Sequence, residues 1–391
     1  MFQLLLAVVY LSFISLGLPD ALLGSAWPSM YAGLGVPLSY AGIVSMLIAG
    51  GTILSSLLSG RLVRRLGTGM VTAVSVGTTA AALWGFSASR SFFALCLWAV
   101  PYGLGAGAVD AALNNFVAVH CQARHMNWLH CFWGLGATLG PYVMGAGLAA
   151  GRGWPFGYRT VALLQAALTA ALVCALPLWR RQNDGAKAEG PAAPLTLRQM
   201  TALPGAKPIL AAFFCYCSLE QVSGLWGGSY LVLGKGLSPE RAASLTALFY
   251  LGITAGRLLS GFLALRMETG HLIRLGQGLV CAGAAALFLS RTVSGLCAGL
   301  VLAGLGCAPI YPGLLHQTPR RFGAAASQSM MGLQMACAYV GTTLSPPVVG
   351  LLTQRWGVML YPLVQLLFAG TMFLLVEAGS RSARSGGTVL E

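Results

Sequence analysis

Long apolar runs separated by short polar breaks fill almost the whole chain. Helices need about 20 apolar residues to cross a bilayer, and twelve runs approach or exceed that length. Their backbone must be helical, because polar groups in lipid have to be hydrogen bonded within their own segment. The pattern therefore predicts an all-α membrane protein with twelve transmembrane helices. The predicted spans lie near residues 2–30, 39–62, 69–88, 92–119, 127–149, 157–179, 208–234, 240–264, 271–290, 294–318, 322–353 and 358–378.

One longer polar stretch, rich in Pro, Ala and charge, interrupts these runs at residues 180–207. Such a composition is typical of a linker that need not pack. It divides the chain into a six-helix bundle at 1–179 and a second one at 208–380, followed by a tail at 381–391. We expect the linker and the tail to be cytoplasmic.

The two predicted bundles share features in the same order. Asp20 is followed by Trp27 in the first span, and Glu220 is followed by Trp226 in the seventh. The fourth and tenth spans each contain a Gly-Leu-Gly sequence, and the fifth and eleventh each contain proline near glycine. These matches predict internal duplication, and hence two pseudo-symmetric bundles with a binding site between them.

Composition excludes several other classes of protein. Only 8% of the 391 residues are charged, against about 25% in soluble domains, which leaves no room for a sizeable soluble domain. The net charge of +14 does not indicate nucleic-acid binding, because the basic residues lie in short loops and form no single patch. Those residues favour the even-numbered loops and the tail by about two to one, which predicts both termini on the cytoplasmic side. We expect a multi-pass protein of a bacterial inner membrane, working as a monomer in the lipid bilayer.

Acidic residues inside the apolar spans are the strongest candidates for function, because a carboxylate there costs about 2.5–3.5 kcal/mol on insertion scales. Asp20 follows Pro19, which removes a backbone donor and opens the helix. Its carboxyl could bind a polar solute or a proton, or simply cap a kink. Glu220 could likewise face a solute, or lie at the membrane interface.

Asp110 is the second strong candidate. It lies in the middle of the fourth span, and Gly103, Gly107 and Asn114 share its helix face by their spacing. The glycines should thin that face and leave space for the two polar groups. Asp110 could then carry a proton, or it could make a structural hydrogen bond to a neighbouring helix.

Weaker candidates are polar or aromatic residues near these acids in the sequence. His130 shares a face of the fifth span with Asn127, and could relay a proton or bind a hydroxyl group, or be a satisfied core residue. Trp side chains stack on the apolar faces of sugars and offer an N–H donor, although each could equally serve packing. The substrate-binding candidates are Asp20, Asn114, Asn115, Asn127, His130, Trp133, Glu220, Trp226, Tyr311 and Gln334, and the proton-coupling candidates are Asp110 and Asp20.

Three arginines at the end of the second span, Arg61, Arg64 and Arg65, could form a gate or could only determine topology. The chain contains no GxxxxGK[ST], HExxH or nucleophile-elbow sequence. We therefore expect no enzyme activity, no catalytic residues, no cofactor and no metal. The cysteines lie mostly inside apolar spans, where they behave as small hydrophobic residues.

The sequence resembles the major facilitator superfamily in two short stretches. Gly60–Gly67, with the sequence GRLVRRLG, is similar to its loop signature between the second and third spans, but lacks the usual acidic residue. Gly140-Pro141 is similar to the glycine-proline signature of the fifth span.

A narrower resemblance is to the fucose permease group of sugar–proton symporters. Gly103–Val117, with the sequence GLGAGAVDAALNNFV, is similar to the fourth span of that group, where an acidic residue is followed by Asn and then by Phe-Val. Asn127–His130 resembles its fifth span, and Glu220 with Trp226 its seventh. The resemblance implies that Asp20 binds substrate and Asp110 carries the coupling proton.

These patterns lead to a main hypothesis and two alternatives. The first is a secondary transporter for a small polar solute, a monosaccharide by the resemblance, coupled to protons or else to sodium. Asp110 would cycle the proton, and Asp20 with Asn114 would bind hydroxyl groups, while the halves rock around them. The alternatives are an exporter or antiporter of amphipathic compounds, with Met and aromatic side chains in an adaptable pocket, and a receptor that binds solute without moving it.

Overall fold

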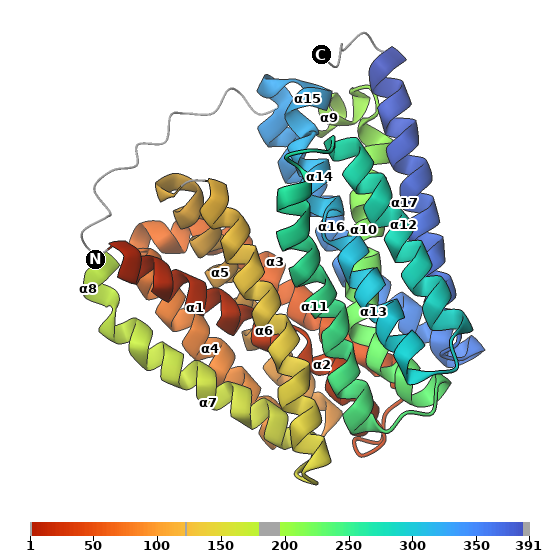
Figure 1. Ribbon diagram of the computed structural model, residues 1–391. Helices are drawn as coiled ribbons and strands as arrows, with labels where there is room; N and C mark the ends of the chain where they lie inside the picture. The colour runs from red at the N-terminus through yellow and green to blue at the C-terminus, as the bar shows by residue number, and fades with distance from the viewer. Residues whose placement is uncertain (1, 122, 180–195, 386–391) are drawn as a thin grey trace. The chain divides into compact units, whose positions relative to one another are not determined.

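The computed structural model describes residues 2–121, 123–179 and 196–385, and its regular structure there is helical (Figure 1). Apart from the 3₁₀ turn η1 (Leu38–Tyr40) and the π-helical turn η2 (Tyr230–Gly234), the elements are α-helices. They are α1 (Phe2–Asp20), α2 (Leu22–Met30), α3 (Ala41–Leu66), α4 (Thr68–Ala88), α5 (Phe92–His120), α6 (Ala123–Ala149), α7 (Gly153–Cys174), α8 (Leu176–Trp179), α9 (Leu197–Ala202), α10 (Ala206–Ser229), α11 (Pro239–Leu263), α12 (Thr269–Leu289), α13 (Val293–Cys307), α14 (Ile310–His316), α15 (Thr318–Phe322), α16 (Ala324–Trp356) and α17 (Leu360–Ser385).

Within the described residues, eleven helical segments are long and apolar enough to cross a membrane. They correspond to eleven of the twelve predicted spans. The remaining span is the fifth in chain order, predicted near 127–149. It forms α6, whose 27 residues also suffice to cross a bilayer. Its Asn, His and Gly content makes it less apolar than the others. The prediction of an all-α membrane protein is confirmed.

The described chain forms two compact units. Unit 1 contains residues 2–179, 224–251 and 346–358, and unit 2 contains 196–223, 252–345 and 359–385. Helices α10, α11 and α16 contribute residues to both. The predicted division into bundles at 1–179 and 208–380 remains a prediction.

Close backbone contacts hold unit 1 together. Helix α3 packs against α5, which packs against α4, while α1 packs against α6. A Cβ atom at Gly103 would lie 2.1 Å from the Ile48 carbonyl oxygen, and one at Gly107 would lie 2.2 Å from that of Thr52. Glycine is used in this way where membrane helices approach closely. The sequence predicted open space beside these glycines, and that prediction is wrong, because α3 fills it.

Unit 2 contains a second set of close contacts. Helix α12 packs against α13, α14 and α17, and a Cβ at either Gly276 or Gly306 would lie 2.5 Å from the carbonyl oxygen of the other. Part of the predicted linker belongs here too. Thr196 and Gln199 form a capping box at the start of α9, and Met200 packs against a buried cluster that includes Met330. Most of residues 196–207 nevertheless stay exposed. The predicted linker remains a prediction, and its residues 180–195 lie outside the described residues.

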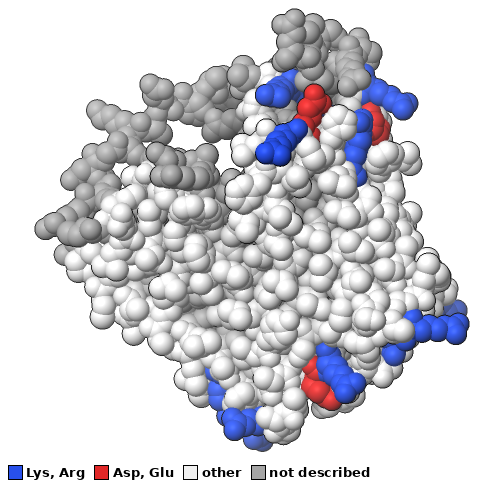
Figure 2. Space-filling view, viewed as in Figure 1, with Lys and Arg blue, Asp and Glu red and all other residues white. Residues whose placement is uncertain are grey.

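The outer helix faces carry large apolar side chains, such as Leu57, Phe93 and Leu265, which are at least three-quarters exposed. Over the helices of unit 2, the charged side chains visible in Figure 2 gather near the helix ends, and the surface between them is uncharged. An uncharged apolar surface between two charged ends is what a bilayer requires.

Candidate functional site

A break in the first span creates the candidate site in unit 1. Helix α1 ends at Asp20, directly after Pro19, and α2 begins at Leu22. Proline has no N–H to give to the carbonyl four residues earlier, which is that of Ser15. The Nε2 of Gln165 in α7 donates to this oxygen at 2.7 Å, and the Oε1 of Gln165 accepts a hydrogen bond from Thr79 in α4. The kink that exposes Asp20 is therefore fixed by buried hydrogen bonds.

The Asp20 carboxyl group accepts hydrogen bonds from two other helices. The Tyr102 hydroxyl of α5 donates to Oδ1 at 3.0 Å, and Nε1 of Trp133 in α6 donates to Oδ2 at 2.8 Å. Two glycines make this possible. A Cβ at Gly17 would lie 2.0 Å from the Trp133 carbonyl oxygen, and one at Gly136 would lie 2.0 Å from that of Ile14. The backbones of α1 and α6 therefore touch, and the Trp133 indole reaches Asp20.

The Asp20 side chain nevertheless stays exposed, although its neighbours Pro19 and Ala21 are buried. Both oxygens already hold one donor, and each carboxylate oxygen can accept more than one hydrogen bond. An accessible acceptor with two fixed donors in the middle of an apolar span is suited to a ligand hydroxyl group.

Asp110 lies on α5 within electrostatic reach of Asp20. Asn114, one turn later, donates from Nδ2 to Oδ1 of Asp110 at 2.9 Å and to its backbone oxygen at 3.0 Å. The Oδ2 atom has no hydrogen-bond partner in the described chain. Asp110 and Asn114 are both half-buried. The predicted Asp110–Asn114 pair is present, and it leaves one carboxyl oxygen available for a proton.

The remaining unit 1 candidates lie in different surroundings. His130 is half-buried, with its ring edge-on to Phe13 at 6.0 Å between centroids. Trp133 also packs edge-on against Tyr250, at 6.4 Å. Asn115 is exposed, and the side chain of Asn127 lies outside the described part of the chain.

In unit 2, Glu220 lies in a polar cluster that the sequence did not predict. Glu220 of α10 and Arg257 of α11 both act electrostatically on Tyr216 and on Cys307. Tyr311 packs its ring against Tyr216, with 5.9 Å between centroids. The acidic Glu220 and the basic Arg257 thus have Tyr216 and Cys307 as common neighbours.

Two candidates in the second half of the chain lie in packed surroundings. Trp226 is 2% exposed, and its indole N–H donates to the Pro346 carbonyl oxygen at 3.1 Å. Gln334 is fully buried, and its Oε1 accepts from the Thr318 hydroxyl at 3.0 Å. Both side chains are enclosed by other protein groups, and their role in solute binding remains a prediction.

The three arginines Arg61, Arg64 and Arg65 are exposed in the last turns of α3. Cations are favoured there by the helix dipole, so their position agrees with either of the two roles considered for them.

Three residues, two in the site of unit 1 and one in the polar cluster of unit 2, were missed from the sequence. Tyr102 and Gln165 carry ordinary patterns, and only the three-dimensional packing brings them to Asp20 and Ser15. Arg257 did carry a signal, because a basic residue inside the apolar run of the eighth span is as costly as an acid.

Comparison with known proteins agrees with this architecture. The Major Facilitator Superfamily matches residues 9–290 and 209–383. A crystal structure of a mutant of the nucleoside transporter NupG superposes with a TM-score of 0.74 at 15% identity, covering 96% of this chain and 98% of that one. A bacterial homologue of the human lysosomal transporter Spinster gives a TM-score of 0.70 at 14% identity, covering 99% and 97%.

A curated relative, an uncharacterized MFS-type transporter of Yersinia pestis, is 24% identical over 265 residues, or 65% of this chain. The match spans 64% of the relative, just under two thirds of its length. The chain belongs to the Major Facilitator Superfamily. It is therefore an all-α, multi-pass membrane protein of a family of transporters.

Proposed function

We propose that this transporter moves a monosaccharide by proton symport, with Asp20 as the principal solute-binding group. The observation that carries the proposal is the exposed Asp20 carboxyl group, held by Tyr102 and Trp133 at a break in the first span. Sugars offer several hydroxyl donors and apolar ring faces. A fixed carboxylate accepts hydrogen bonds from the hydroxyl groups, and an indole beside it can stack on the ring faces.

Asp110 is the proposed proton carrier. Its free Oδ2 atom and its half-buried position let it exchange a proton without breaking its bond to Asn114. Because Asp20 lies within electrostatic reach, the charge state of one carboxyl group affects the other. Protonation and solute binding are thereby linked, as symport requires.

Further residues complete the proposal in supporting roles. Asn114, Asn115, Asn127 and His130 are assigned to hydroxyl binding in the first half. Glu220, with Arg257 and Tyr311, is assigned to the second. Rocking of six-helix halves at 1–179 and 208–380 would expose the site alternately to the two sides. Arg61, Arg64 and Arg65 would guard the cytoplasmic side, with both termini there, in a bacterial inner membrane.

The first test identifies the solute. Purified protein is heated with monosaccharides, nucleosides, amino acids and lipophilic drugs, because a specific ligand stabilises the folded state. We expect a monosaccharide to raise the unfolding midpoint of the wild-type protein and to leave that of the Asp20→Asn variant unchanged. Glu268→Gln, at an exposed carboxylate, is the matched control and should respond as wild type does. Stabilisation by drugs and not by sugars would contradict the proposal and favour export of amphipathic compounds. Stabilisation by nucleosides alone would contradict the choice of monosaccharide.

A further inference from the structure

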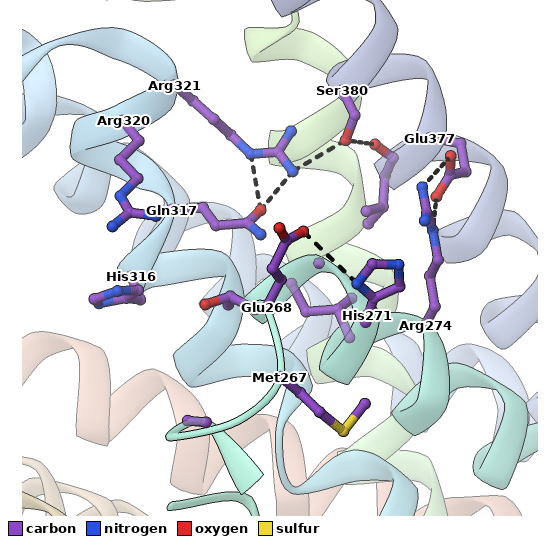
Figure 3. A pocket seen from close by; sticks show the side chains of 15 residues that line it. Met267, Glu268, His271, Arg274, His316, Gln317, Arg320, Arg321, Glu377 and Ser380 are labelled. Atoms are coloured by element: carbon purple, nitrogen blue, oxygen red, sulfur yellow. Dashed lines mark hydrogen bonds and ion pairs between the residues drawn. The ribbon is translucent and has the colours of Figure 1, made fainter. Parts of the chain in front are cut away.

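A cavity of about 670 Å³ at one end of unit 2 is lined by polar side chains, several of which already partner one another (Figure 3). Glu377 accepts two hydrogen bonds from Arg274, at 2.7 Å from Nε and 3.0 Å from Nη2. The guanidinium group of Arg321 donates to the side chains of Gln317 and Ser380. These engaged groups do not indicate a ligand, whereas the surroundings of the proposed solute site contain an aromatic residue without an assigned role.

That residue is Tyr250 of α11, which lies near both groups that hold the Asp20 carboxyl group. Its ring packs edge-on against the Trp133 indole, with 6.4 Å between centroids and 72° between the ring planes. This separation lies in the range of about 4.5–7 Å that such pairs favour. Tyr250 also acts electrostatically on Tyr102. All four residues belong to unit 1, so a side chain from beyond the predicted linker packs against a donor to Asp20.

A glycine of α10 determines where the Tyr250 ring can lie. A Cβ atom at Gly224 would lie 2.1 Å from the Tyr250 hydroxyl oxygen and 3.1 Å from its ring carbon Cζ. A larger residue at this position would therefore push the ring away. The α10 backbone is held at the same point by α2, because a Cβ at Gly24 would lie 2.1 Å from the Gly224 carbonyl oxygen. Gly224 thus contacts α2 through its backbone and leaves room for the Tyr250 hydroxyl group.

The Trp133 indole needs a neighbour of this kind. It is half-buried, and rotation about its side-chain bonds would take Nε1 away from Oδ2 of Asp20, to which it donates at 2.8 Å. A binding group keeps its geometry when packing restricts the rotamers of the residues that support it. The edge-on Tyr250 ring supplies that packing for the indole.

We propose that Tyr250 is a positioning residue of the solute site, which holds the Trp133 indole on the Asp20 carboxyl group and is itself seated against Gly224. This role rests on the function proposed above for Asp20. Because Tyr250 acts through Trp133, its contribution to solute binding depends on the presence of that indole. The site at the break of the first span therefore includes a side chain of α11 and depends on a glycine of α10.

The first measurement that tests this role needs no solute. Ligand-free protein with ¹⁵N-labelled tryptophan is studied by NMR in detergent, and hydrogen exchange with water is measured for the Trp133 indole N–H. Its resonance is the one that is missing from Trp133→Phe. The indole N–H of Trp27 donates to the Leu38 carbonyl oxygen at 2.7 Å, and it is the internal reference for general loosening of the protein.

Tyr250→Leu should speed exchange at Trp133 about two- to tenfold, the factor that an edge-on aromatic pair contributes, and leave Trp27 unchanged. Gly224→Ala should act in the same direction, because its Cβ displaces the Tyr250 hydroxyl group. It should have a much smaller effect in a Tyr250→Phe background, where the displaced oxygen is missing. Phenylalanine keeps the buried ring, so this comparison decides the question even if Tyr250→Leu does not fold.

The second measurement is calorimetry with the monosaccharide identified by thermal stabilisation. Tyr250→Leu should weaken solute binding about two- to tenfold in otherwise wild-type protein, and have little effect in a Trp133→Phe background. Tyr142→Leu removes an exposed tyrosine ring from α6, and Gly278→Ala adds a Cβ that meets nothing within 4 Å. These two controls should change neither measurement.

Unchanged exchange at Trp133 in both Tyr250→Leu and Gly224→Ala would overturn the proposal. Equal acceleration at Trp27, or an effect of Gly224→Ala that persists in the Tyr250→Phe background, would do the same. An equal loss of affinity from Tyr250→Leu with and without the Trp133 indole would also contradict it. If no monosaccharide binds, the function proposed for Asp20 fails on its own, and the exchange rates still decide whether Tyr250 positions Trp133.

Discussion

The indole N–H of Trp133 donates a 2.8 Å hydrogen bond to Oδ2 of Asp20, although 113 positions separate the two residues. Together with the Tyr102 bond to Oδ1, it holds the carboxyl group by both oxygens. The acid is thereby oriented before any solute arrives, which reduces the cost of ordering it on binding.

The Asp20 arrangement predicts energetic coupling between Trp133 and Asp20. Trp133→Phe should weaken solute binding about tenfold, because it removes a charge-assisted hydrogen bond. The same substitution should also lower the unfolding midpoint of the ligand-free protein, and it should do so much less in an Asp20→Asn background, since the charge it served is gone. Trp128→Phe, at an exposed position of the same helix, is the control. Equal effects of Trp133→Phe on the midpoint in both backgrounds, measured by scanning calorimetry, would rule out the coupling.

Gln165 should be important for stability, because it satisfies the Ser15 carbonyl that Pro19 cannot bond. Replacing it by methionine keeps a similar length but leaves that oxygen without its donor. We expect a loss of about 1–3 kcal/mol, the usual cost of an unsatisfied buried group, seen as a lower unfolding midpoint in detergent. Thr169→Val lies one turn later on α7, and its hydroxyl bonds only within its own helix, so it should change the midpoint little. A midpoint for Gln165→Met equal to that of Thr169→Val would contradict this assignment.

Two glycines, one inside the α3–α5 contact and one outside it, should respond differently to alanine. At Gly103 a Cβ would lie 2.1 Å from the Ile48 carbonyl oxygen, whereas at Gly50 of α3 a Cβ meets nothing within 4 Å. Gly103→Ala should therefore destabilise the protein by about 1–3 kcal/mol through overpacking, and Gly50→Ala should not. Yields and unfolding midpoints of the two variants, compared side by side, check this. Equal tolerance of both would show that α3 and α5 do not pack as closely as described.

Glu220 and Arg257 should depend on each other for stability. Removing one of two opposite charges in a half-buried cluster leaves the other uncompensated, whereas removing both does not. Glu220→Gln and Arg257→Gln should each lower the unfolding midpoint, and the double variant should lower it less than the sum of the two. Strict additivity would argue against a shared cluster.

Much of the fold could be predicted from the sequence, because a segment that spans a lipid bilayer can adopt few kinds of backbone structure. The apolar run lengths predicted the helices, and Pro19 predicted the break beside Asp20. The error at Gly103 and Gly107 has a physical cause. A glycine predicts that something comes close, but not whether that is a solute or another backbone. Tyr102 and Gln165 could not be found, because their roles depend on which helices become neighbours.

For the same reason, the sequence predicted residue types better than residue pairings. Asp110 and Asn114 are one turn apart on one helix, so their contact follows from helix geometry alone. The Trp226 and Gln334 side chains were candidates by type, but tertiary packing buries them. Arg257 could have been found from the sequence, because a basic residue inside an apolar span costs as much free energy as an acidic one.

The most direct test of proton symport is solute-driven proton movement. Purified protein in proteoliposomes, with a pH-sensitive dye inside and no imposed gradient, receives the monosaccharide identified by thermal stabilisation. Wild-type protein should acidify the lumen as solute enters. Asp110→Asn should still exchange labelled for unlabelled solute but move no protons. Glu268→Gln should behave as wild type. Solute entry without acidification in wild-type protein, or unchanged acidification with Asp110→Asn, would contradict the account.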